Sequence, residues 1–202
     1  MRVTQDSLSW AISILGLILP ALLLTYNVTD FVTFNTLMIV WGFGMAGTIL
    51  LWTSKTPIVD DPSFGQKDVQ KVSRYTTIAF LVMLIASVAV PNLFTSMVPL
   101  QSTGQTRLLY GMFFAVNEET FFRGGFLFQM YSRYPSKIAA SAMSAGAFSV
   151  FHWAVYGTQL DAIWFVFVAG AALSYAVLWS GRMTPAYLSH ILWNILAISG
   201  GV

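Results

Sequence analysis

The sequence predicts an all-α membrane protein, a polytopic bundle of about seven transmembrane helices. Three observations lead to this fold class. Only 9% of the 202 residues are charged while 56% are hydrophobic, long uncharged runs follow one another along the chain, and most Lys and Arg residues fall between those runs. An ordinary soluble domain carries about a quarter charged residues, so the composition excludes both a water-solvated surface and disorder.

Crossing about 30 Å of hydrocarbon takes roughly 20 helical residues. Seven runs reach this length: Ser7 to Thr29, Phe31 to Ser54, Tyr75 to Thr106, Leu108 to Ser132, about Ala139 to Leu160, Ala162 to Gly181 and Met183 to Val202. The first run lacks a small-residue cleavage pattern, so we interpret it as a retained span. The polar segment Thr53 to Arg74 is expected to be a solvated helical face or a loop at the lipid headgroups.

The basic residues predict the orientation of the bundle. With seven spans, one side of the membrane carries Arg2, Lys55, Lys67, Lys71, Arg74, Arg133, Lys137 and Arg182, and the other side carries only Arg107. The positive-inside rule then predicts an integral protein of the cell membrane with a cytoplasmic amino terminus and an external carboxyl terminus. Basic residues this scattered make no phosphate-binding patch, so we expect the lipid bilayer and no nucleic acid as a partner.

The fourth run is interrupted by three charged residues, Glu118, Glu119 and Arg123. Facing lipid, they would cost on the order of 8 to 10 kcal/mol together, so they are expected to face the interior of the bundle. Glu119 and Arg123 are four residues apart, a spacing that favours an ion pair on one helix face. At about 100° per residue, Glu118 should point elsewhere and be free to serve a cavity.

Both histidines of the chain lie in apolar runs. His152 belongs to the fifth run, and His190 shares one face of the seventh with Asn194, four residues later. Separate burial of each polar group beside a backbone carbonyl or a hydroxyl remains open. The simpler explanation is that Glu118, His152, His190 and Asn194 surround one cavity, because isolated polar groups are costly in hydrocarbon.

Three motifs carry a family resemblance. Glu118 to Arg123 matches EExxxR, Phe148 to His152 matches FxxxH, and His190 to Asn194 matches HxxxN, in that order. The chain thereby resembles the CPBP family of intramembrane proteases, named for CAAX proteases and bacteriocin-processing enzymes and also called the Abi family. The resemblance divides the chain into N-terminal transmembrane helices with a cytoplasmic loop (1–106) and a catalytic core (107–202).

The resemblance implies hydrolysis of a peptide bond in a membrane-embedded or lipidated protein substrate. It assigns activation of the attacking water to Glu118 and His152, and places His190 and Asn194 at the oxyanion. Glu118, His152 and His190 could alternatively hold a catalytic Zn²⁺, since two His and one Glu form a known zinc ligand set. The sequence leaves both mechanisms open, and therefore either no cofactor or Zn²⁺.

Three other classes of function use some of the same residues. A small transporter would also hide ionisable groups, but no pair of broken helices marks an inverted repeat. A haem protein could use the two histidines as axial ligands, but this function would leave Glu118 and Glu119 unexplained. A catalytically silent relative could serve as an immunity or scaffold protein, yet the motif set is intact.

Overall fold

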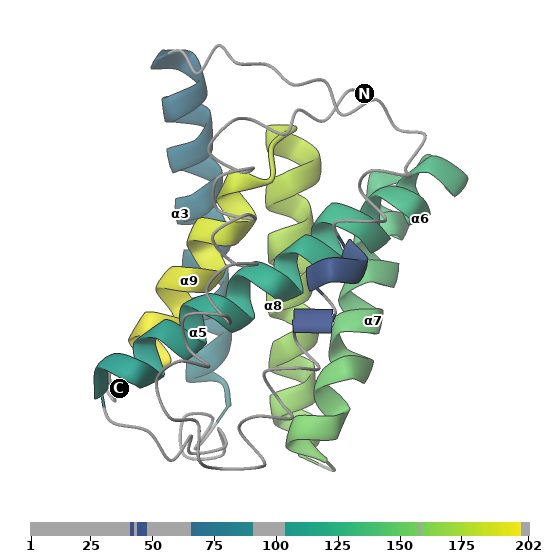
Figure 1. Cartoon of the computed structure of the whole chain (residues 1–202). Helices are drawn as coiled ribbons and strands as arrows, with labels where there is room; N and C mark the ends of the chain where they lie inside the picture. The colour runs from purple at the N-terminus through teal and green to yellow at the C-terminus, as the bar shows by residue number, and fades with distance from the viewer. Residues whose placement is uncertain (1–40, 43, 48–65, 91–103, 158, 199–202) are drawn as a thin grey trace.

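The computed structural model describes residues 41–42, 44–47, 66–90, 104–157 and 159–198, and these ranges contain helices and no β-strand (Figure 1). The helices are α3 (Gln66–Val88), α5 (Gly104–Glu119), the π-helix η1 (Thr120–Phe126), α6 (Leu127–Arg133), α7 (Lys137–Tyr156), α8 (Leu160–Ser180) and α9 (Thr184–Ile198). The predicted all-α class is confirmed for this part of the chain.

Among the described helices, α3 over Lys67–Val88 and α8 over Leu160–Ser180 are long and apolar enough to cross a membrane. The count of seven spans is not confirmed. The first predicted run and most of the second lie outside the described residues, and so does much of the loop in the third. The fourth run is divided into α5, η1 and α6, and α9 has only 15 residues.

Helix α3 begins at Gln66, nine residues before the predicted span at Tyr75. Its first turns carry Lys67, Lys71 and Arg74, all of which are exposed, while Val72 on the opposite face is buried. The end of the polar segment is therefore a solvated helical face, one of the two structures expected for it.

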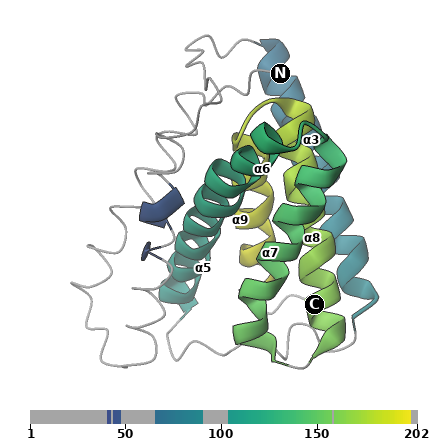
Figure 2. The same cartoon turned by 90° about the vertical axis from the view of Figure 1, so that its right-hand side faces the viewer.

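Helix α8 lies at the centre of the bundle (Figures 1 and 2). It packs against α7, α3 and α9, and α5 packs along α9. Small buried residues on α8, Ala169, Gly170, Ala172 and Ala176, let the neighbouring helices approach closely. One hydrophobic core joins these helices, with large members Met83, Phe122, Phe148, Phe165, Leu173, Tyr187 and Trp193.

The outer surface of the bundle is strongly apolar. Large apolar side chains on three helices are each at least 68% exposed: Ile85 and Val88 on α3, Ile138 and Val150 on α7, and Leu160 on α8. Soluble monomers rarely expose apolar surface on this scale. Lipid is a solvent in which such a surface carries no penalty, which agrees with the membrane location predicted from composition.

A tight turn places α9 beside α3. Helix α8 ends at Ser180, and the next residue, Gly181, has a φ of 74°, the left-handed conformation that a glycine adopts without strain. The Ser180 hydroxyl accepts from the Arg182 backbone N–H at 3.0 Å. The buried Arg182 guanidinium then binds Asp68 of α3 at 2.8 Å. The turn and this ion pair fix the start of α9 against the start of α3.

Two glycines bring a short helical stretch, 44–47, directly against the α5–η1 junction (Figure 2). A Cβ atom built on Gly47 would lie 2.6 Å from the Phe121 backbone nitrogen and from the Thr120 carbonyl carbon. A Cβ on Gly44 would collide with the Asn117 side chain. Only glycine permits this contact, because the obstacle at Gly47 is backbone that cannot rotate away.

Replacement of Gly47 by alanine is therefore expected to destabilise the fold. The added methyl group must push η1 aside, at a cost typical of overpacking, about 1 to 3 kcal/mol. Thermal unfolding in detergent measures the loss as a lower midpoint. Gly146→Ala is the matched control, because a Cβ there meets nothing within 4 Å; its midpoint should be unchanged or slightly raised. Equal midpoints for the two variants would contradict the tight contact at Gly47.

Candidate active site

Glu118 of α5 and His152 of α7 face each other. His152, near the end of α7, places its Nε2 3.8 Å from Oε2 of Glu118, the penultimate residue of α5. Its Nδ1 lies 2.9 Å from the Phe148 carbonyl oxygen, one turn back. A carbonyl can only accept, so Nδ1 carries the proton and the Nε2 lone pair is directed toward the carboxyl group.

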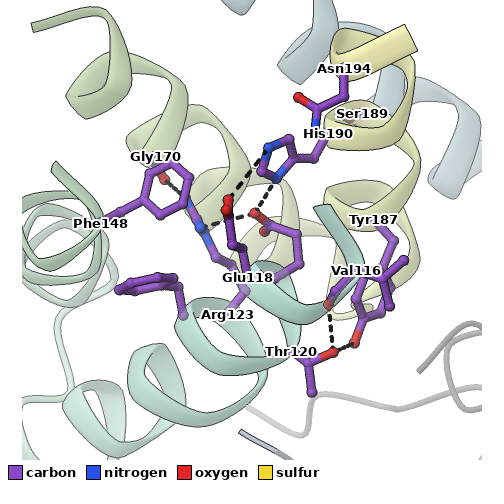
Figure 3. A network of polar contacts seen from close by, with 12 residues as sticks. Val116, Glu118, Thr120, Arg123, Phe148, Gly170, Tyr187, Ser189, His190 and Asn194 are labelled. Atoms are coloured by element: carbon purple, nitrogen blue, oxygen red, sulfur yellow. Dashed lines mark hydrogen bonds and ion pairs between the residues drawn. The ribbon is translucent and has the colours of Figure 1, made fainter. Parts of the chain in front are cut away.

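His190 of α9 lies between the two adjacent glutamates (Figure 3). Its Nδ1 is 2.8 Å from Glu119 Oε1, and its Nε2 is 3.8 Å from Glu118 Oε2. The Glu119 carboxylate accepts the Nδ1 hydrogen, which fixes the orientation of the ring. Nε2 is thus aimed at the same carboxyl oxygen that His152 faces.

Glu118 and Glu119 leave α5 in different directions, yet both side chains contact His190. Consecutive residues do diverge by about 100° around a helix. Because α9 lies alongside α5, the His190 ring fits into the angle between the two side chains and contacts one with each nitrogen. The two glutamate side chains therefore point in different directions but contact the same imidazole ring, that of His190.

Glu119 and Arg123 form a completely buried ion pair, with Arg123 Nη1 3.0 Å from Glu119 Oε1. Arg123 is part of the π-helix η1. A π turn shifts the following residues by about one position relative to an α-helix, and such turns are frequent at functional sites. The spacing predicted the partner, but the sequence contained no signal for the π turn that we recognised.

Phe148 and Gly170 complete the environment of Arg123. The guanidinium carbon lies 4.3 Å from the centre of the Phe148 ring, and Nη2 donates to the Gly170 carbonyl at 3.2 Å. A Cβ on Gly170 would lie 3.2 Å from Nη2 and 3.1 Å from the Ala145 backbone. The Phe of FxxxH thus covers a buried cation, and Gly170 leaves room for it. Our sequence reasoning did not single out Gly170.

Asn194 holds α9 to α5 rather than contacting the carboxylates. Its Nδ2 donates to the Gly111 carbonyl at 2.8 Å, and Figure 3 shows the side chain beyond His190. One of the two amide hydrogens of Asn194 is therefore already hydrogen-bonded within the protein. The second amide hydrogen and Oδ1 have no partner among the described residues, so the side chain retains polar atoms for the cavity that it lines.

A cavity of about 50 Å³ is lined by His152, His190 and Asn194, three of the four residues predicted to surround one cavity, whereas Glu118 is not among its lining residues. Its polar lining consists of His152, Tyr156, His190 and Asn194, and its apolar lining includes Met83, Phe148, Phe165, Val166, Leu173 and Trp193. A water needs about 10 to 15 Å³ of such space and two to four polar partners. The cavity therefore has the room and the hydrogen-bonding groups to hold water next to His152 and His190.

One family model matches the part of the chain that builds this site. Residues 101–196 match the type II CAAX prenyl endopeptidase Rce1-like family. This part of the chain is similar to that family. The resemblance to the CAAX-type intramembrane proteases is thereby confirmed, whereas the division of the chain at 106/107 stays a prediction. Comparisons with curated proteins and with solved structures give no match.

Glu118, His152 and His190 are the candidate ligands for a metal ion at this site. Chemically the donors suit zinc, because both imidazoles present Nε2 and each Nδ1 is held by a carbonyl or a carboxylate, the usual second partner of a metal-bound histidine. As they are placed, however, the described residues include no group of three His, Asp or Glu side chains that could hold a metal ion. Glu118, His152 and His190 do not fit a metal here, and we derive no step through one.

A second polar contact joins the start of η1 to α9. Thr120 Oγ1 lies 2.7 Å from the Val116 carbonyl and 2.9 Å from the hydroxyl of the completely buried Tyr187 (Figure 3). Thr120 donates to the carbonyl and accepts from Tyr187. Tyr187 precedes His190 by one helical turn, so this bond helps to set the register of α9 against the glutamates. Our sequence reasoning missed both residues.

Glu119→Gln is expected to lower the amount of folded protein. It leaves Arg123 buried without an opposite charge, a loss of roughly 3 to 5 kcal/mol. Unfolding midpoints in detergent give the measurement. The double variant Glu119→Gln with Arg123→Met should recover much of the loss, because it removes the unpaired cation as well. Independent, additive effects of the two substitutions would show that the ion pair does not act as a unit.

Proposed function

We propose that the protein is an intramembrane endopeptidase in which Glu118 activates the attacking water with the help of His152. The observation that carries this proposal is the convergence of three proton-accepting atoms. Nε2 of His152 and Nε2 of His190 each lie 3.8 Å from Glu118 Oε2. These separations are too long for direct hydrogen bonds and suit a water held between the groups.

The steps follow from the protonation of each group. Glu118, as a carboxylate, takes a proton from the water while the water oxygen bonds to the scissile carbonyl carbon. His152 Nε2 holds the water in position, because its Nδ1 hydrogen is already bound to Phe148. When the carbon–nitrogen bond breaks, the protonated Glu118 returns its proton to the leaving amine. Peptide and water thus become a carboxylic acid and an amine.

His190 and Asn194 are proposed to act near the oxyanion. Asn194 retains one amide hydrogen beyond the one it donates to Gly111. His190 Nε2 lies 3.8 Å from Glu118 Oε2, so this nitrogen is close to the carboxyl group that activates the water. Donors fixed in advance in a dry site are the most effective stabilisers of developing negative charge.

The family name identifies the first substrate class to test. Type II CAAX prenyl endopeptidases are named for prenylated proteins that end in a CAAX sequence. We propose such a lipidated protein, held in the bilayer by its prenyl chain, as the substrate here. A lipid-anchored peptide is delivered to the depth of buried catalytic groups without crossing bulk water.

Cleavage of a prenylated CAAX peptide in proteoliposomes is the direct test. Wild-type protein should release the three terminal residues, and Glu118→Gln should reduce turnover to background while remaining folded, since the amide keeps the volume but cannot act as a base. Asp161→Asn is the matched control, an exposed carboxylate outside the site whose loss should leave turnover unchanged. Full activity of Glu118→Gln would refute the assignment of the base. A folded wild-type protein without any cleavage would favour a silent scaffold.

A chelator separates the two mechanisms that the sequence left open. With a water activated by Glu118 and His152 alone, turnover should survive incubation with a zinc chelator. Loss of activity that is restored by added Zn²⁺ would instead assign Glu118, His152 and His190 to a metal.

The charge distribution supports the proposed orientation. The start of α3, the α6–α7 junction and the α8–α9 turn lie at one end of the bundle (Figure 1). This end carries six basic residues, Lys67, Lys71, Arg74, Arg133, Lys137 and Arg182. The Lys137 ammonium lies 4.7 Å from the Trp179 ring, and aromatic and basic residues together are typical of the membrane interface. We assign this end to the cytoplasm.

An epitope tag inserted at Lys67 tests this orientation. In intact cells the tag should be inaccessible to an external protease and become cleavable after the membrane is permeabilised. A tag at the opposite end, beside Asp161, should show the reverse pattern. External access at Lys67 would overturn the assignment.

A further inference from the structure

Tyr156 is a polar side chain that lines the cavity and has no assigned task. It is only 8% exposed and lies one helical turn after His152 on α7. Its ring is stacked on the His152 ring, with centres 6.1 Å apart and planes inclined by 16°. Among the described residues its hydroxyl has no hydrogen-bond partner, and its oxygen is not one of the fully enclosed polar atoms that lack a partner, so it is accessible to the cavity that the residue lines. A buried phenol normally has one, so this hydroxyl is available to a molecule in the cavity.

The other polar groups of the cavity have few hydrogens left to donate. His152 uses its Nδ1 hydrogen on the Phe148 carbonyl. His190 uses its Nδ1 hydrogen on Glu119. Asn194 uses one of its two amide hydrogens on Gly111. In the neutral state of both imidazoles, the lining therefore offers mainly acceptors, whereas hydrolysis creates an oxyanion that requires donors.

We infer that Tyr156 is a further catalytic residue, whose phenol hydrogen binds the oxyanion of the tetrahedral intermediate. This inference rests on the proposed endopeptidase function. When the Glu118-activated water attacks, the carbonyl π electrons move to the carbonyl oxygen. The phenol donates a hydrogen bond to that oxygen and keeps its proton. When the carbon–nitrogen bond breaks, the carbonyl re-forms and the bond weakens, so no proton is gained or lost at Tyr156.

The position of Tyr156 is suited to this role. The stack on His152 restrains the orientation of the phenol, and the cavity presents its hydroxyl to whatever the cavity holds. A donor fixed beforehand needs no rearrangement as charge develops, which is why such donors favour the transition state over the bound substrate. The hydroxyl group should therefore contribute to kcat more than to KM.

The test compares three tyrosine variants in the proteoliposome assay. Tyr156→Phe removes only the hydroxyl and keeps the stacked ring. Tyr156→Leu removes the ring as well. Tyr134→Phe is the matched control, because Tyr134 is 47% exposed at the end of α6, outside the site. Each variant is assayed for kcat, KM and unfolding midpoint beside wild type and Glu118→Gln.

Loss of one oxyanion donor typically lowers kcat by about 100- to 1,000-fold. Tyr156→Phe should show a loss of this order with KM and unfolding midpoint nearly unchanged, and Tyr134→Phe should behave as wild type. A wild-type kcat in Tyr156→Phe, together with a lowered kcat in Tyr156→Leu, would overturn the inference. Tyr156 would then only support the His152 ring, and the proposed endopeptidase function would be unaffected. Absence of cleavage by folded wild-type protein would overturn both.

Discussion

The fold around the site depends on the burial of one cation, the Arg123 guanidinium. An isolated charge in this interior would cost several kcal/mol, so every group that lowers the cost is held in place by it. Glu119 supplies the opposite charge, Gly170 supplies a carbonyl, and Phe148 supplies the face of its ring. These partners come from α5, α8 and α7. A single side chain on η1 thereby fixes three helices relative to one another.

The burial of Arg123 also positions the proposed catalytic groups, because one oxygen of Glu119 contacts both Arg123 and His190. Glu119 Oε1 contacts both Arg123 and His190, so the buried cation orients the carboxylate and the carboxylate orients the imidazole. The remaining nitrogen of His190 then faces Glu118. Phe148 connects to the site in a second way, because its carbonyl fixes the His152 tautomer. The three sequence motifs therefore form one connected assembly, joined by the Glu119–His190 hydrogen bond, the Arg123–Phe148 cation–π contact and the close approach of His152 to Glu118.

Hydropathy and helical spacing predict a large part of this arrangement. The cost of charge in hydrocarbon predicts that Glu118, Glu119 and Arg123 turn inward, and a separation of four residues predicts the ion pair. Those arguments do not specify which helices are neighbours. The π turn, the space that Gly170 leaves for Arg123 and the Thr120–Tyr187 contact all depend on which helices pack against each other. Counting residues along straight helices also puts His190 nearer the surface than Glu118, whereas α5 and α9 run obliquely across the bundle (Figure 1).

The size of the cavity limits what can enter the site as it stands. About 50 Å³ has room for water but not for a peptide segment, so the reacting groups are held together before a substrate arrives. Electrostatic interactions are stronger in such a closed, weakly polarisable interior than in water. The cavity also touches four different helices, through Met83 of α3, Phe148 of α7, Val166 of α8 and Trp193 of α9. A peptide can reach Glu118 by this route only if some of these helices separate. Substrate entry therefore depends on loosening the same helix packing that shields the charged groups from water.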